Sequence, residues 1–514
     1  MARSTVLVMF ATLGSTILGF AREVVTARYF GASSDLDAFL AALVVPTILF
    51  GVFNGALVSA LVPIFSGYVS TSRPAEAARL ACTLILSISI LLAGAAVVAW
   101  FFAPYYVPLI LHFPHDRLAL TVNLTRLLLP MIVATSLSGI MAALLNAHQR
   151  FAASALQGLV LNAAVILVVE FGFAKYGVAT LVFGTVLGYF AQLAVQLPAF
   201  LSLSGLRWSI DLKHPGLKNV FDMLGPVAIG SAAGQIALFF DRFFASGLSV
   251  GSISGMNYAV KIVGFPQQLF VSAIATVIFP VFASQFANRN RLGMRRSIAT
   301  SLQLVIFCTV PSALGLIMLA GPIVRTLFER GAFTTEATAL CASLLPYASA
   351  GLVALAANVV LTRCTFACGQ ARLTVTTSVA TVVLNVVLSL LWLPTLGARG
   401  LLLANTVSQT LQTLVLGCIA WRVVGGFDAL GVGRSFLKIL GCSAIMVAAL
   451  LVVQSFEPPV VSGELSRIVS LGEHLAFGAA VFLGLARLVD SEEVHLAIAL
   501  IVKRQRPPDL VPLP

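Results

Sequence analysis

The sequence predicts an all-α integral membrane protein with fourteen transmembrane helices, and its composition is the first of three observations that support this fold class. Of its 514 residues, 59% are hydrophobic and only 10% are charged, and the mean hydropathy is +1.02. Soluble domains carry about 25% charged residues. Because the deficit runs along the whole chain, a soluble fold would need a core with almost no surface, which surface-to-volume scaling excludes.

The second observation is a series of fourteen apolar segments, each long enough for a helix of about 20 residues to cross a bilayer. They centre near residues 17, 53, 90, 133, 162, 190, 233, 268, 310, 350, 383, 411, 444 and 478. The first segment continues past Gly19 to about Phe30 without a small-x-small site, so we expect a retained helix rather than a cleaved signal. The short connections leave no room for a soluble domain.

The third observation is an internal repeat. "LVPIFSGY" (61–68) returns as "IFPVFASQ" (278–285), and "RLLLPMI" around Pro130 returns as "SLLPYAS" around Pro346, at a spacing of roughly 216 to 221 residues. A unit of six helices returns the chain to the same side of the membrane. We therefore expect two six-helix lobes related by a pseudo-two-fold axis along the membrane normal, with a cavity between them.

The predicted domains follow from this repeat. The N-terminal lobe covers 1–210, the C-terminal lobe covers 211–427, two extra transmembrane helices cover 428–490, and a tail covers 491–514.

The positive charges between the segments set the orientation. Most Lys and Arg of the connections fall in alternate turns, such as those of Arg150, Arg295 and Arg372, whereas the other turns carry few, such as Arg117 and Arg399. The positive-inside rule then predicts both termini and the tail in the cytoplasm. It also explains the net charge of +12 by topology rather than by nucleic-acid binding.

A few charged residues lie at membrane depth, where each costs about 2.5 to 3.5 kcal/mol or more. Arg22 and Asp37 stand in the first two helices, and Arg242 and Lys261 stand in the equivalent helices of the second half. We expect Arg22 to face the cavity, since a neighbour at i,i+1 such as Glu23 points elsewhere on a helix. Cations in a cavity suit an anionic ligand, and guanidinium can grip phosphate bidentately.

Missing motifs exclude several classes of function. No G-x-x-x-x-G-K-[ST] run is present, which argues against an ATP site, and no H-E-x-x-H motif or His-supported Cys pair indicates a metal site. A membrane glycosyltransferase or ligase would need a catalytic outer loop that this chain lacks. We therefore expect a transporter rather than an enzyme, without a cofactor or nucleic-acid partner.

"GFAREVVTARYFGASSDLDAF", "LVPIFSGY" and "NYAVKIVGFPQQLFVSAIATVIFPVFASQF" together resemble the MurJ/MviN family of lipid II flippases, in the multidrug/oligosaccharidyl-lipid/polysaccharide exporter superfamily. The resemblance implies a multi-pass protein of the bacterial cytoplasmic membrane. By alternating access it would move an undecaprenyl-diphosphate-linked peptidoglycan precursor from the inner to the outer leaflet, for cell-wall synthesis and cell shape. It also implies a groove for the polyprenyl tail at the last two helices.

The resemblance also implies site residues. Arg22 in "GFAR" matches a cavity arginine of the family, and Asp37 in "DAF" matches an important acid. The chain departs from the pattern at Thr16, Phe50 and Gly51, which stand where the family has basic residues, and Lys261 replaces an arginine. A flippase for another polyprenyl-diphosphate-linked glycan, such as an O-antigen or exopolysaccharide unit, therefore stays an alternative. A drug or cation antiporter and a non-transporting scaffold are further alternatives.

Some members of the family bind sodium in the second lobe. Asp241 and Asn385 resemble parts of that site, Thr406 is a candidate further ligand, and Ser389 stands where an acid is expected. The alternative for Asn385 is a hydrogen bond between helices. Without an ATP site, the energy source expected here is a Na+ or H+ gradient or the membrane potential.

Overall fold

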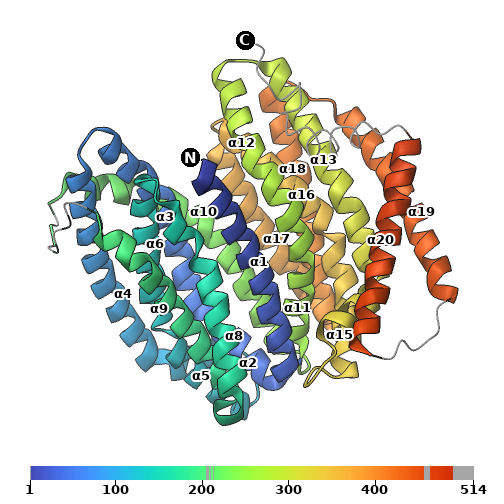
Figure 1. The fold of residues 1–514 in the computed structure, drawn as a ribbon, viewed down its shortest axis with the longest axis horizontal. Helices are drawn as coiled ribbons and strands as arrows, with labels where there is room; N and C mark the ends of the chain where they lie inside the picture. Colours follow the sequence, from blue (N-terminus) through green and yellow to red (C-terminus); the bar gives the residue numbers. More distant parts are fainter. Residues whose placement is uncertain are drawn as a thin grey trace. The chain divides into compact units, whose positions relative to one another are not determined.

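The computed structural model describes residues 2–203, 206, 208, 210–211, 213–456 and 463–489, excepting the side chains of 2–7, 9, 49–60, 215, 221, 223–231, 233 and 272–273. Its regular structure is helical, and no strand occurs among these residues (Figure 1). The helices are α1 (Ala2–Phe30), α2 (Ser34–Ala42), α3 (Val44–Ser70), α4 (Pro74–Ile110), α5 (His115–Leu128), α6 (Met131–Ala147), α7 (Phe151–Ala155), α8 (Gln157–Tyr176), α9 (Ala179–Leu201), α10 (Pro215–Ser246), α11 (Ser252–Pro266), the π-helical η1 (Gln267–Val271), α12 (Ser272–Ala287), α13 (Arg291–Met318), α14 (Ala320–Phe328), α15 (Thr335–Ala350), α16 (Leu352–Ala367), α17 (Ala371–Leu396), α18 (Ala398–Val424), α19 (Ala429–Phe456) and α20 (Glu464–Leu488).

The membrane-spanning segments agree in position with the apolar segments of the sequence. Among the described residues, ten helical stretches are long and apolar enough to cross a membrane, and a pair bent by 45°, Ser252–Val271 with Ile274–Ala287, would be an eleventh. The expected spans near residues 17, 53 and 233 fall on α1, α3 and α10, parts of whose side chains lie outside the description. The all-helical membrane fold is therefore confirmed, and the total of fourteen spans stays a prediction.

The internal repeat is visible in how the helices end. In α3, α6, α12 and α16 a backbone amide just beyond the helix closes the last turn onto a carbonyl five residues earlier, as in a Schellman motif. The donor and acceptor pairs are Arg73 and Tyr68 (2.9 Å), Arg150 and Leu145 (2.8 Å), Asn290 and Gln285 (2.8 Å), and Gln370 and Thr365 (2.9 Å). Gly177 and Gly397 end α8 and α17 with φ of 52° and 56° and the same ψ of −132°. The two halves therefore turn at equivalent places.

Packing divides the chain into two compact units. Unit 1 contains Met1–Ser254 with Arg330–Thr334, and unit 2 contains Gly255–Glu329 with Thr335–Pro514. The division falls after α10 because this helix packs along α3 of unit 1. The predicted lobes 1–210 and 211–427 describe the sequence repeat and remain a prediction.

Each unit has an apolar core built by equivalent helices of the repeat. In unit 1 the core joins α3, α4, α6 and α9 around Phe65 and Phe200, and in unit 2 it joins α12, α13, α16 and α18 around Phe282. Phe65, Phe200 and Phe282 are fully buried. Fully burying such a side chain contributes about 1.5 to 3 kcal/mol. The cores therefore hold each helix set in a defined register and fix where the charged residues lie.

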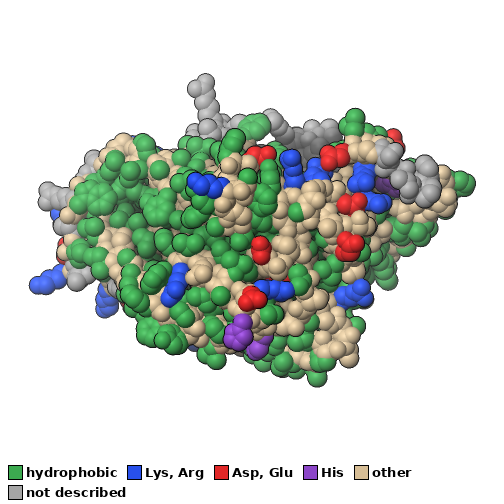
Figure 2. Space-filling model, turned by 90° about the horizontal axis from the view of Figure 1, so that it is seen from below, with side chains coloured by type: hydrophobic (Ala, Val, Ile, Leu, Met, Phe, Trp, Pro, Cys, Tyr) green, Lys and Arg blue, Asp and Glu red, His purple; other side chains and the backbone are tan. Residues whose placement is uncertain are grey.

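The last two helices form a separate layer of unit 2. α19 and α20 pack on α13 through a cluster that includes Phe307, Met446 and Phe482. Elsewhere many large apolar side chains face outward, among them Leu109 at 79% and Phe171 at 84% exposure. Figure 2 shows hydrophobic side chains over much of the face that it draws. An apolar surface of this kind suits a hydrocarbon environment.

Candidate functional site

Arg22 lies deep in α1 and is paired with its own neighbour. Its Nη2 lies 2.7 Å from Oε1 of Glu23, and the side chains are 27% and 9% exposed. The expectation that Glu23 would point elsewhere is wrong, because the long arginine side chain curves around the helix to reach the carboxylate. Arg22 is therefore a half-exposed cation that is partly neutralised by a buried acid.

Asp37 lies near the start of α2 and is almost fully buried, at 2% exposure. Its Oδ2 accepts a hydrogen bond of 2.7 Å from the Gly251 amide, and its Oδ1 accepts one of 2.8 Å from the Ser254 amide. These amides belong to the first turn of α11 and the residue before it, where helix N–H groups have no partner inside the helix. The carboxylate thus caps α11 from a distant helix, and a negative charge there also suits the helix dipole.

Arg242 holds the same connection from α10. Its Nη1 donates a hydrogen bond of 2.9 Å to the carbonyl of Ile253, and the carboxylates of Asp241 and Asp37 act on its guanidinium electrostatically. Asp37 and Arg242 therefore both bond to the backbone of 251–254. Asp37 accepts from two amides, and Arg242 donates to a carbonyl. The Asp37 carboxylate and the Arg242 guanidinium are both hydrogen-bonded to the protein backbone in this conformation. These bonds position the α10–α11 connection.

Two loops close on helix ends in a repeated pattern. The amide of Ala332 donates a 2.7 Å hydrogen bond to the carbonyl of Arg28, close to the end of α1. Gly31 and Gly331 have φ of 58° and 59°, and a Cβ on either would overlap a backbone carbonyl of the other segment. These two glycines are therefore required both by their conformation and by the close approach.

The second loop lies between α4 and α5. The amide of His112 donates a 2.9 Å hydrogen bond to Oγ of Ser246 at the end of α10, and the rings of His112 and Phe243 are 4.9 Å apart. In the sequence repeat this loop corresponds to the one that contains Ala332, and the end of α10 corresponds to the end of α1. The loop of each half thus closes on the first helix of the other half, and all these residues belong to unit 1.

The remaining predicted residues are more dispersed. Asp241 is half-buried near the end of α10 in unit 1, and Lys261 is exposed on α11 in unit 2. Thr406 donates a 2.9 Å hydrogen bond to the carbonyl of Tyr347 within unit 2. Thr16 bonds to the carbonyl of Thr12 in its own helix. The side chain of Phe50 and the surroundings of Gly51 lie outside the description.

Asn385 differs from Asn162, which also follows a Val-Leu pair in the first half. Asn162 on α8 donates a 3.2 Å hydrogen bond to the carbonyl of Ser15 on α1, which is the kind of helix–helix bond considered for Asn385. Asn385 is 2% exposed, and neither atom of its amide has a hydrogen-bond partner among the described residues. The Oγ of Ser389, one turn later on α17, is also buried without one. Buried polar groups of this kind call for an unseen water or ion.

Sequence reasoning did not find the partners of these residues. Gly251, Ser254, Ser246 and Ala332 act through backbone groups or a small hydroxyl, which no motif marks. The signal available was the Gly-Ala pair that follows a helix in both "YFGAS" and "ERGAF". Among the described residues, the site contains no arrangement of nucleophile and base. Its residues can bind an anion and hold or release a connection between helices.

Comparison with known proteins decides the family. The family model described as "Lipid II flippase MurJ" matches residues 26–470. The chain belongs to the MurJ family of lipid II flippases.

Three similar proteins each cover 80% of the chain or more. A probable lipid II flippase MurJ from Rhizobium tropici is 28% identical over 517 residues, covering 97% of this chain and 96% of the relative. One from Vibrio cholerae is 30% identical and covers 80% and 82%, and the lipid II flippase MurJ of Burkholderia cenocepacia is 28% identical and covers 85% and 86%.

Solved structures support the fold. A lipid II flippase MurJ in an inward closed conformation matches with a TM-score of 0.80 at 24% identity, over 94% of this chain and 98% of that one. A multidrug resistance MATE family transporter of the MOP superfamily in an inward-facing conformation matches with a TM-score of 0.71 at 14% identity, over 80% and 94%. The fold is therefore that of MurJ and MATE transporters.

Proposed function

We propose that this protein translocates lipid II, the undecaprenyl-diphosphate-linked peptidoglycan precursor, from the inner to the outer leaflet of the bacterial cytoplasmic membrane. The observation that carries the proposal is the match to MurJ flippases over most of the chain, together with a half-buried Arg22 in α1, the first helix. A guanidinium at membrane depth is costly, and an anionic headgroup would offset that cost. The protein is then a transporter and not an enzyme, and it uses no ATP.

The proposed architecture is the one expected from the repeat. Fourteen helices form two six-helix lobes about a pseudo-two-fold axis, followed by two helices, with both termini in the cytoplasm. In this orientation α1 runs outward, so its end near Arg28 and Gly31 belongs to the outer face. The contacts of Asp37, Arg242, Ala332 and His112 would then close the outer side of the pathway.

The proposed mechanism is alternating access. Substrate enters from the cytoplasmic side while the outer contacts are closed, and its diphosphate pairs with Arg22. Translocation requires the Asp37 cap and the two loop contacts to release, because they join segments of the two halves. Since each is a small number of hydrogen bonds worth about 0.5 to 1.5 kcal/mol apiece, or somewhat more for the charged Asp37, the closed state can open without unfolding a core.

Lys261 and the ion residues complete the proposal. Lys261 would add a point charge for the substrate where the family has a bidentate arginine. Asn385, with Ser389 on the same face of α17, would contribute oxygens to a Na+ site, and Asp241 and Thr406 are the further candidates from the resemblance. The energy would come from a Na+ or H+ gradient or the membrane potential.

Native mass spectrometry of the purified protein tests the substrate class. The proposal expects lipid II to co-purify with the wild-type chain and to be lost from Arg22→Ala. If a different polyprenyl diphosphate glycan co-purifies instead, that glycan is the substrate. The observation that favours this alternative is Thr16, which stands where the family has an arginine. Binding of organic cations without any polyprenyl diphosphate would point to an antiporter instead.

A further inference from the structure

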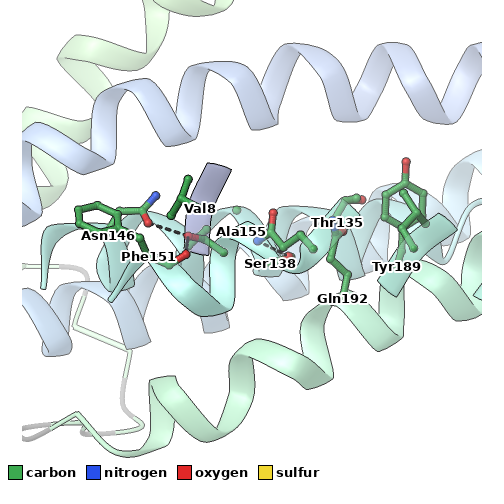
Figure 3. A pocket seen from close by; sticks show the side chains of 13 residues that line it. Val8, Thr135, Ser138, Asn146, Phe151, Ala155, Tyr189 and Gln192 are labelled. Atoms are coloured by element: carbon green, nitrogen blue, oxygen red, sulfur yellow. Dashed lines mark hydrogen bonds between the residues drawn. The ribbon is translucent and has the colours of Figure 1, made fainter. Parts of the chain in front are cut away.

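Unit 1 contains a cavity that the residues described above do not use. It has a volume of about 550 Å³, which lies within the range of about 300 to 1,000 Å³ for small-molecule pockets. Its walls come from α1, α6, α7, α8 and α9 (Figure 3), and Val8 is the contribution from the described side chains of α1. The cavity therefore lies inside one compact unit.

The described residues of the lining combine apolar and polar side chains, and none of them is Asp, Glu, Lys, Arg or His. Its hydrogen-bonding side chains, apart from a tyrosine, are Thr135, Ser138, Asn146, Ser154, Gln157 and Gln192. Part of this set is already organised by internal hydrogen bonds. Gln157 and Gln196 both donate to Oγ of Ser138, at 3.2 and 2.5 Å, and Ser154 donates to Oδ1 of Asn146 at 2.8 Å.

Some polar groups of the lining make no hydrogen bond within the described structure. Within the described residues no hydrogen bond is found for the side chain of Gln192 or for Nδ2 of Asn146, and the amide of Gln192 lines the cavity. Gln196 is fully buried against Ser138, and its Oε1 has no partner there. Gln192 and Asn146 are half-buried, so a polar and uncharged occupant of the cavity can use their remaining hydrogen-bonding groups.

Two rings mark the ends of the cavity. Figure 3 shows Phe151 beside Asn146 at one end, and Tyr189 near Thr135 and Gln192 at the other. The charge of Arg22 acts on the hydroxyl of Tyr189, so this end lies within electrostatic range of the proposed diphosphate site. A ligand with an anion at Arg22 can therefore extend a neutral part into the cavity.

From this arrangement we infer that the cavity binds the uncharged sugar portion of a glycan-bearing lipid diphosphate, with hydroxyl and acetamido groups on the Gln and Asn side chains. A sugar supplies both donors and acceptors, as a carboxamide does, and its apolar faces can lie on the two rings. An acyl chain would leave the amides unpaired, and a charged group would find no counter-charge among the described residues of the lining. This inference rests on the proposed function, since it assigns a subsite to the same substrate.

The test compares binding of two probes to the full-length protein: lipid II, and undecaprenyl diphosphate, which has no sugar. Gln192→Leu removes the free amide at nearly constant volume. It should weaken lipid II binding about tenfold, since it removes one or two hydrogen bonds to the sugar, and leave undecaprenyl diphosphate binding unchanged. Gln409→Leu, at a half-buried glutamine of α18 outside the cavity, is the matched control and should change neither.

Asn146→Ala, at the opposite end, gives a second variant in case Gln192→Leu is unstable, and it should act in the same direction. Lipid II stripped of its peptide separates sugar from peptide recognition and should show the same loss with Gln192→Leu. Equal losses for both lipids, no loss for either, or a loss that disappears with the peptide would each overturn the sugar subsite while the flippase proposal stands. If the wild-type protein binds neither lipid, the proposed function fails first.

Discussion

The carboxylate of Asp37 on α2 accepts a 2.8 Å hydrogen bond from the amide of Ser254, in the first turn of α11. Its other oxygen accepts from Gly251 at 2.7 Å. One buried side chain of the first half of the chain thus caps the N-terminus of a helix in the second half. This contact is the element that must break if α2 and α11 are to separate.

Asp37→Asn should loosen this cap. A carboxamide has one acceptor oxygen instead of two, so one of the two amides loses its partner, at a cost of about 1 to 3 kcal/mol. Hydrogen exchange followed by mass spectrometry should show faster exchange over 251–256. Asp35→Asn changes an exposed acid in the same turn of α2 and is the control. Unchanged exchange in Asp37→Asn would mean that the cap does not hold the connection.

Gly331→Ala should disrupt the loop that closes on the end of α1. The residue has φ of 59°, and an added Cβ would overlap the carbonyl of Arg28. Gly369→Ala is the matched control, because Gly369 also has a positive φ of 73° but has open space around its Cβ position. Both variants carry the strain of about 1 to 2 kcal/mol for a left-handed backbone. Only Gly331→Ala should also speed hydrogen exchange of the Ala332 amide.

Equal exchange at Ala332 in the two glycine variants would show that the Gly331 substitution does not disturb the contact with α1. The close approach of the loop to α1 would then have no part in keeping the contact closed.

Na+ should stabilise the protein through Asn385, whose buried amide lacks a partner in the described structure. A cation that binds only the folded state raises the melting temperature with concentration. We expect a higher melting temperature in NaCl than in KCl at equal ionic strength, and no such difference in Asn385→Leu, which removes the amide. A sodium effect that survives in Asn385→Leu would place the ion elsewhere.

The sequence predicts the helices well, because apolar length is a local property. The expected segments near 90, 310 and 444 fall on α4, α13 and α19, and the repeat appears again in the paired helix ends at Gly177 and Gly397. The boundary between the two compact units could not be predicted from the sequence, because packing sets it. The packing of α10 along α3 depends on side chains far apart in the chain, and no periodicity reports it.

The candidate site could be predicted only as residue types. Charges at membrane depth mark Arg22 and Asp37 as unusual, but the sequence cannot give their partners. Glu23 reaches Arg22 because of side-chain flexibility, and Asp37 bonds to backbone amides that have no residue signature. The neutral cavity was missed because its polar residues, such as Ser138 and Gln192, are spread over several helices and each is unremarkable alone.

The account depends most directly on Arg22, and growth of cells depleted of their own lipid II flippase measures its role. Arg22→Ala should fail to support growth at normal protein level, because it removes a charge-assisted contact worth about 1.5 to 3 kcal/mol, or roughly 10- to 100-fold in affinity. Arg22→Lys should rescue in part, since it keeps the charge but not the bidentate geometry. Arg126→Ala, at a half-buried cation stacked on Trp100, is the control and should grow normally. Full growth with Arg22→Ala would contradict the central claim.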